Sequence, residues 1–143
     1  MATTHLLYLH GFRSSPASFK AQRLKAWFAA RGQSERFLCP ALPPSPAQAM
    51  DEVHALVAGR DADRFAVIGS SLGGFYATAL AETTGCRAVL LNPAVWPARD
   101  LASYIGEQRA WHSEERFWFR PEYIAELEAL TPARISQTQR YLL

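Results

Sequence analysis

The sequence predicts an α/β fold in which helices flank a parallel β-sheet. Short runs rich in strand-forming residues alternate with longer runs whose apolar residues recur at helical spacing. Each strand and helix together take about 25 residues, which is typical of parallel strands joined by right-handed crossovers. The chain has 143 residues, of which 49% are hydrophobic and 20% charged, so residues 1–143 are expected to form one domain with a substantial core.

The first predicted strand, His5–His10, is a nearly continuous apolar run, as in strands that are covered on both faces. A helix is expected to start at Ser15, because a serine followed by proline is a common N-terminal signal. Gly32 should end that helix. A second strand is expected at Arg36–Cys39.

The same signals define the next units. Ser45, again followed by proline, predicts a second helix that ends before Gly59. A third strand is expected at Arg64–Ile68, a third helix from about Leu72 to Thr84, and a fourth strand at Arg87–Leu91.

Residues 96–120 break this alternation and are rich in aromatic side chains. We interpret them as a small lid over a site, where the rings line a pocket and exclude water. The alternative is that the rings only pack the lid onto the sheet. A further helix should begin at Arg120 and dock on the sheet through an apolar stripe that includes Leu127.

Charge and composition exclude several kinds of partner and cofactor. The net charge is +2 and no basic run is present, so nucleic acid is not expected as a partner. No apolar segment reaches the roughly 18 residues that a membrane span needs, and no secretory signal is recognisable, so we expect a cytoplasmic protein without a membrane partner. Cys39 and Cys86 lack metal-type spacing and are expected to be buried free thiols, and no metal or cofactor is implied.

The five residues Gly69 to Gly73 match the pattern G-x-S-x-G between a predicted strand and a predicted helix. A phosphate-binding loop would need a lysine after its second glycine, which is absent, and the glycine spacing does not fit a dinucleotide site. The motif predicts Ser71 as a nucleophile on a sharp turn. Gly69 and Gly73 are expected there because a side chain would collide with neighbouring backbone. An ordinary glycine-lined turn is the alternative.

A serine nucleophile needs donors for an oxyanion, and two backbone N–H groups are candidates. They belong to Leu72, directly after the serine, and to Phe12, in the turn after the first strand. His10 and Gly11 are expected to shape that turn, although His10 is also a candidate base. Because the loops after parallel strands gather at one edge, residues 11–14, 70–74 and 92–96, including Asn92, should face one site.

Three motifs carry a resemblance to a known family: LHGFRSSPASFKAQ at 9–22, GSSLGGFYA at 69–77 and LLNPAV at 90–95. Together they resemble the small bacterial α/β-hydrolase esterases of the YqiA type (UPF0227), over essentially the whole chain. The resemblance implies an α/β-hydrolase fold and a serine esterase that acts on a small-molecule carboxylic ester or thioester. It also implies that Ser71 is the nucleophile and that Phe12 and Leu72 form the oxyanion hole.

The family pattern places an acid and a histidine after a strand that resembles Tyr141–Leu143. We therefore expect the chain to be a fragment that lacks its last strands and about 50 residues, and to be nearly inactive alone. Asp100 and His112 could complete a triad within the chain. The alternative from a different class of function is a non-catalytic α/β-hydrolase-like binding or structural module. An unpaired sheet edge would favour a homodimer.

Overall fold

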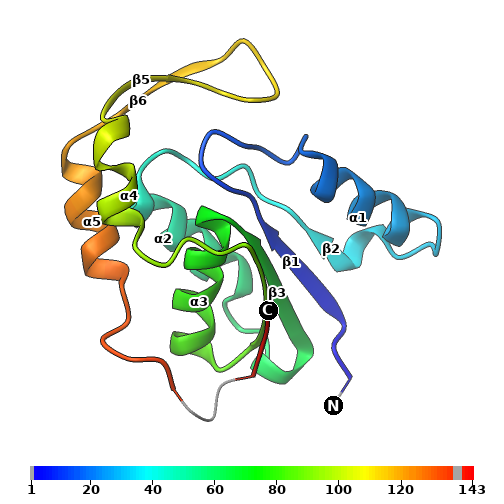
Figure 1. Ribbon diagram of the computed structural model, residues 1–143. Helices are drawn as coiled ribbons and strands as arrows, with labels where there is room; N and C mark the ends of the chain where they lie inside the picture. The colour runs from blue at the N-terminus through cyan, green and yellow to red at the C-terminus, as the bar shows by residue number, and fades with distance from the viewer. Residues whose placement is uncertain (1, 137–139) are drawn as a thin grey trace.

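A computed structural model describes residues 2–136 and 140–143 (Figure 1). Its main sheet is parallel throughout, with the strand order β2-β1-β3-β4-β7. The α/β prediction is therefore confirmed. The strands are β1 (His5–Leu9), β2 (Phe37–Leu38), β3 (Phe65–Ser70), β4 (Arg87–Leu91) and β7 (Tyr141–Leu142).

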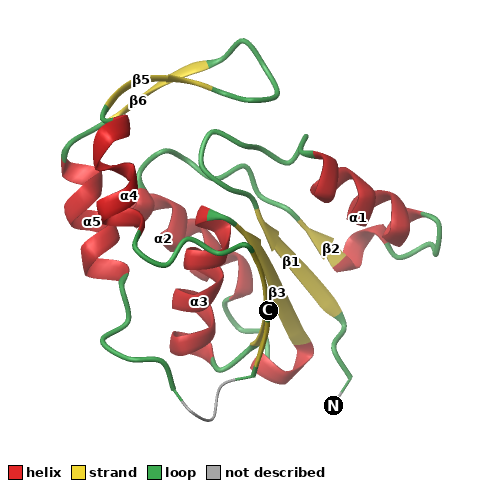
Figure 2. Cartoon of the chain, in the orientation of Figure 1, coloured by secondary structure: helices red, strands yellow, loops and turns green. Residues whose placement is uncertain are grey.

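Helices connect these strands, with α1 on one side of the sheet and α2 and α3 on the other (Figure 2). None of the helices in the described part of the chain is long and apolar enough to cross a membrane. The helices are α1 (Phe19–Ala29), α2 (Pro46–Val57), α3 (Leu72–Thr84), α4 (Pro97–Leu101) and α5 (Glu122–Leu130), with 3-10 turns at Ser34–Arg36, Ala62–Arg64 and Ala102–Tyr104.

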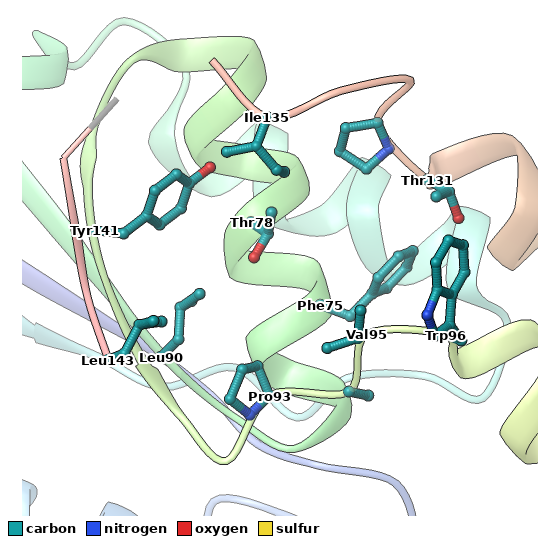
Figure 3. Close-up of a pocket in the computed structure, with 12 residues that line it drawn as sticks. Phe75, Thr78, Leu90, Pro93, Val95, Trp96, Thr131, Ile135, Tyr141 and Leu143 are labelled. Carbon is teal, nitrogen blue, oxygen red and sulfur yellow. The ribbon is translucent and has the colours of Figure 1, made fainter. Parts of the chain in front are cut away.

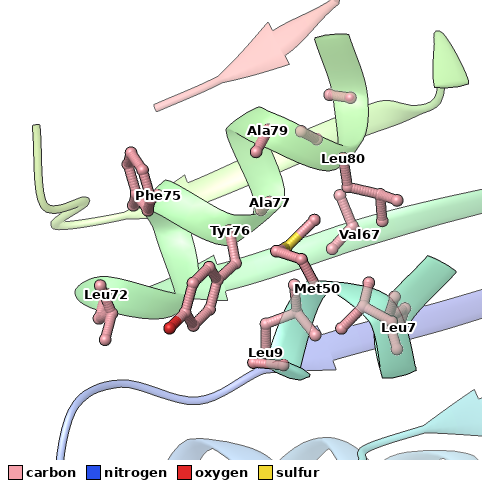
Figure 4. Packing of buried hydrophobic residues seen from close by; sticks show 14 of the residues in the cluster. Leu7, Leu9, Met50, Val67, Leu72, Phe75, Tyr76, Ala77, Ala79 and Leu80 are labelled. Atoms are coloured by element: carbon pink, nitrogen blue, oxygen red, sulfur yellow. The ribbon is translucent and has the colours of Figure 1, made fainter. Parts of the chain in front are cut away.

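The core lies between the sheet and the two helices α2 and α3 (Figure 4). Leu7 and Val67 project from neighbouring strands toward Met50 of α2 and Leu80 of α3, and all four side chains are buried. This packing holds α3 against the sheet, and the G-x-S-x-G motif lies where β3 passes into α3.

The opposite face of the sheet is less covered. Residues on β3 and β4 that alternate with the core positions, such as Ile68 and Val89, are only partly buried. The edge strands are β2 and β7, and Leu142 on β7 is 64% exposed. A homodimer through this edge stays a prediction.

The structure corrects the predicted start of the first helix. Helix α1 begins at Phe19, and its N-cap is Ser18, whose hydroxyl accepts a hydrogen bond from the backbone N–H of Ala21. The hydroxyl of Ser15 instead accepts from the N–H of Ala17 in a local turn. The second helix does start as predicted, at Ser45, which caps it through the N–H of Gln48.

The region after β4 differs most from expectation. It contains α4 and an antiparallel hairpin of β5 (Gly106–Arg109) and β6 (Arg116–Phe119). Helix α5 packs chiefly on α2 and α4 rather than on the sheet, with Leu127 fully buried. The apolar end of the sequence, Gln139–Leu143, predicts a last strand. Gln139 lies outside the described residues, and β7 covers Tyr141–Leu142.

Candidate active site

Ser71 occupies a strained turn between β3 and α3. Its backbone has φ 56° and ψ −118°, a conformation that non-glycine residues rarely adopt. Its N–H donates to the carbonyl of Leu91 (3.0 Å), and its own carbonyl accepts from the N–H groups of Gly74 and Ala94 (both 2.9 Å). The turn is thus held from both sides, while the side chain is exposed and makes no hydrogen bond to a described residue.

The glycines of the motif are required by close backbone approaches. A Cβ at Gly69 would overlap the carbonyl oxygen of Gly73, and one at Gly73 would overlap the carbonyl oxygen of Leu9. The expected collisions are therefore present, and they bring α3 directly against the end of β1. A Cβ at Gly11 would lie 3.2 Å from the Cβ of Ser71 and 3.7 Å from its Oγ, so Gly11 leaves the hydroxyl accessible.

Two residues that line a pocket with Ser71 have backbone N–H groups without an acceptor among the described residues. Leu72 is the first residue of α3, so its N–H has no partner within the helix. Phe12 follows Gly11 in the adjacent loop, and no hydrogen bond to a described residue engages its N–H. The positive end of the α3 dipole adds to the attraction for negative charge at this point.

The three loops predicted to share one site line the same pocket, of about 490 Å³. Phe12 comes from the loop after β1, Ser71 from the loop after β3, and Asn92 and Ala94 from the loop after β4. Asn92 has φ 46°, in the left-handed region that asparagine tolerates better than most residues.

His10 is 5% exposed and both of its ring nitrogens are engaged. The N–H of Leu42 donates to Nε2 (2.9 Å), so Nδ1 carries the proton and donates to the carbonyl of Gly11 (3.0 Å). Burial lowers the pKa of His10, against the opposing effect of the bond to Gly11. A neutral histidine whose two ring nitrogens both form hydrogen bonds shapes the loop and has no nitrogen left to act as a base.

Asp100 and His112 are placed differently relative to Ser71. Asp100 lines the same pocket as Ser71, but its carboxylate accepts from Nε of Arg99 (2.9 Å) and is half exposed. His112 is exposed in the turn between β5 and β6 and is not among the residues that line the pocket. Within the described residues, no hydrogen bond joins His112 to Ser71 or to Asp100, and no group of three metal-ligating side chains occurs.

The aromatic segment packs on the loop that carries Phe12. The ring of Phe12 makes edge-on contacts with Tyr104, Phe117 and Phe119, at centroid distances of 5.6, 5.9 and 5.2 Å. By contrast, Trp118 is 58% exposed. Part of the segment therefore packs against this loop and supports it. The aromatic composition alone could not distinguish this role from the lining of a pocket.

Arg13 belongs to the loop 11–14 that was expected to face the site, but no individual role was predicted for it. It has φ 64°, its Nε donates to the carbonyl of Arg109 (2.6 Å), and its carbonyl accepts from the N–H of Trp111 (2.8 Å). Its guanidinium lies 4.0 Å from the centre of the Trp111 ring. Both side chains line the Ser71 pocket. A basic residue within an apparent loop motif gives no sequence signal for such stacking.

An apolar groove of about 500 Å³ adjoins the site (Figure 3). Phe75 and Thr78 of α3 line one wall, and Tyr141 and Leu143 face them from β7 and the residue after it. Pro93 and Ala94 line both the groove and the Ser71 pocket, so the loop after β4 separates the two.

Comparison with known proteins identifies the family. The model of the Uncharacterised protein family (UPF0227) matches residues 5–143. The chain belongs to this family. The mostly parallel sheet of this chain, flanked by helices, is similar to a solved hydrolase structure, which supports the α/β-hydrolase fold predicted from the motifs.

This structure is described as a "Putative hydrolase" from Agrobacterium vitis S4, with a TM-score of 0.62 and 18% identity over 92% of this chain. FphF, a fluorophosphonate-binding serine hydrolase of Staphylococcus aureus, matches 90% of this chain with 19% identity and a TM-score of 0.47. EstE7, a hormone-sensitive lipase homologue from a metagenome library, matches 93% with 24% identity and a TM-score of 0.41. This UPF0227 chain spans 64%, 59% and 50% of their respective lengths.

Proposed function

We propose that the whole protein is a serine hydrolase that cleaves a carboxylic ester or thioester through an acyl-enzyme at Ser71. The observation that carries the proposal is the exposed Ser71 hydroxyl on a strained turn at the start of α3, in a pocket also lined by Phe12 and Leu72, whose N–H groups have no acceptor among the described residues. Hydrolase neighbours of the same fold support the general class.

In the proposed first step, Oγ of Ser71 attacks the carbonyl carbon of the ester and its proton passes to a histidine. The carbonyl oxygen becomes an oxyanion, which accepts hydrogen bonds from the N–H groups of Phe12 and Leu72. The histidine then returns the proton to the departing alcohol or thiol, leaving an acyl group on Ser71. Water, activated by the same histidine, releases the acid and restores the hydroxyl.

We infer that the acid and histidine follow Leu143 in the whole protein. Strand β7 runs parallel to β4, with Ala88 opposite Tyr141 and Val89 opposite Leu142. Residues that follow β7 would therefore leave the sheet at the edge where the Ser71 pocket lies. His10, whose two nitrogens are already engaged, does not supply this base.

The test is intact mass after incubation with a fluorophosphonate, on the 143-residue chain and on a longer product of the same gene, with Ser71→Ala as control. We expect labelling of the longer form only, because loss of the base costs about a millionfold in turnover. Labelling of neither form would favour a non-catalytic module. Equal labelling of both would instead support Asp100 and His112 as partners of Ser71.

A further inference from the structure

We propose that Arg13, stacked on Trp111 at the Ser71 pocket, binds an oxyanion of the substrate, so that the preferred ester carries a carboxylate or a phosphate. This inference rests on the proposed function and names its substrate class. It begins from the position of the guanidinium, which lines the same pocket as Ser71.

The guanidinium is held in place before any ligand arrives. Its Nε donates to the carbonyl of Arg109, and its plane is covered by the Trp111 ring 4.0 Å away. The backbone of Arg13 is fixed as well, because its carbonyl accepts from the N–H of Trp111. The remaining guanidinium N–H groups can form the paired hydrogen bonds that carboxylates and phosphates accept, with little side-chain entropy left to lose.

The charge of Arg13 is also uncompensated among the described residues. The neighbouring arginines of this region are paired with carboxylates, in Arg99–Asp100, Arg109–Glu114 and Arg116–Glu107. Arg13 has no such partner within 4.0 Å in the described part of the chain. The acidic residue on the pocket lining, Asp100, is already occupied by Arg99, so it does not neutralise Arg13.

A second arginine provides a matched control. The guanidinium of Arg31 lies 3.7 Å from the centre of the Trp27 ring, and its Nη1 donates to the carbonyl of Trp27 (3.0 Å). It therefore has the same stacking and the same kind of carbonyl bond as Arg13, but it lies past the end of α1 and is not among the residues that line the Ser71 pocket.

The first measurement is kcat/KM of the longer gene product, after fluorophosphonate labelling has established that Ser71 is reactive. Three p-nitrophenyl esters of equal acyl length are compared, ending in a methyl group, a carboxylate or a phosphate. We expect an anionic ester to be preferred. Arg13→Gln should reduce that preference about tenfold, Arg13→Lys should retain only part of it because an ammonium keeps the charge but not the paired hydrogen bonds, and Arg31→Gln should leave it unchanged.

The methyl-terminated ester separates recognition from structure. If Arg13→Gln slows all three esters equally, Arg13 only holds the hairpin and the proposal is overturned. It is also overturned if the wild type shows no preference for either anionic ester. A preference that weakens in about 0.5 M salt would support a direct charge contact.

A binding measurement covers the case in which Ser71 is not labelled. In the Ser71→Ala protein, the indole N–H resonance of Trp111, identified by its absence in Trp111→Phe, is followed by NMR. Titration with hexanoate should shift it and 1-hexanol should not, and Arg13→Gln should abolish the shift. Without labelling, this result would support an anion site while the esterase proposal fails. No shift with hexanoate would overturn the anion site itself.

Discussion

A methyl group at Gly73 should strongly destabilise the fold, because α3 approaches β1 most closely there. A Cβ at this position would overlap the carbonyl oxygen of Leu9 and lie 2.6 Å from the carbonyl carbon of Leu9 and 2.7 Å from the carbonyl oxygen of His10. Ordinary contact with a Cβ begins near 3.4 Å. All three atoms are backbone, so no rotamer change relieves the overlap and the helix has to move away from the sheet.

We expect Gly73→Ala to lower the free energy of unfolding by about 3–5 kcal/mol, at the upper end of overpacking substitutions. Gly85→Ala is the matched control at the other end of α3. Gly85 has φ 82° and nothing lies within 4 Å of its added Cβ, so that variant bears only the cost of the left-handed conformation, about 1–2 kcal/mol. A domain at the lower end of the usual range, with a total stability of about 5 kcal/mol, would retain little of it in Gly73→Ala.

Urea unfolding followed by circular dichroism measures the difference. In order of decreasing stability, we expect the wild type, then Gly85→Ala and then Gly73→Ala. Equal midpoints for the two variants would show that α3 and β1 are not in the close contact on which the serine turn depends.

Three further predictions concern the serine turn, the buried histidine and the thiols. Ser71→Gly should be more stable to urea than Ser71→Ala by about 1 kcal/mol, because glycine adopts this backbone conformation without strain; equal stabilities would argue against strain. Burial lowers the pKa of His10, so its contribution to stability is complete above about pH 6.5 and is lost as the pH falls. Urea unfolding at several pH values should therefore show that the free energy of unfolding falls less steeply with acidification in His10→Gln than in the wild type. The same dependence on pH in both proteins would contradict this. Burial raises the pKa of Cys39 to about 11 and also raises that of Cys86, so mass spectrometry should show slow alkylation by iodoacetamide at about pH 8 until urea is added; rapid native labelling would refute it.

The regular units of the fold were predictable because their signals are local. Helix α3 and strand β4 have the predicted bounds, since an apolar run after a glycine-rich turn admits few alternatives. The start of α1 was wrong because Ser15 and Ser18 are both good caps. The choice between them depends on how the loop after β1 wraps around Ser71, which is tertiary information.

The hairpin β5–β6 was not predictable as strands. Its second strand reads Arg-Phe-Trp-Phe, so both faces carry aromatic rings and the alternation that identifies a half-buried strand is hidden. In the structure the alternation is real, with Phe119 buried and Trp118 exposed. The turn between the strands also lacks the Asn-Gly or Asp-Gly pair that marks tight hairpins.

The contacts of Phe12 change what the aromatic segment can do at the site. Opening the hairpin as a free lid would break edge-on contacts with Phe117 and Phe119, each worth about 0.5–1.5 kcal/mol, and would release the bond from Arg13 to Arg109. It would also disturb the loop that carries Phe12 on the lining of the Ser71 pocket. The loop after β4 is coupled to the site in a different way, because the N–H of Ala94 donates to the carbonyl of Ser71 (2.9 Å), so moving this loop would disturb the serine turn itself.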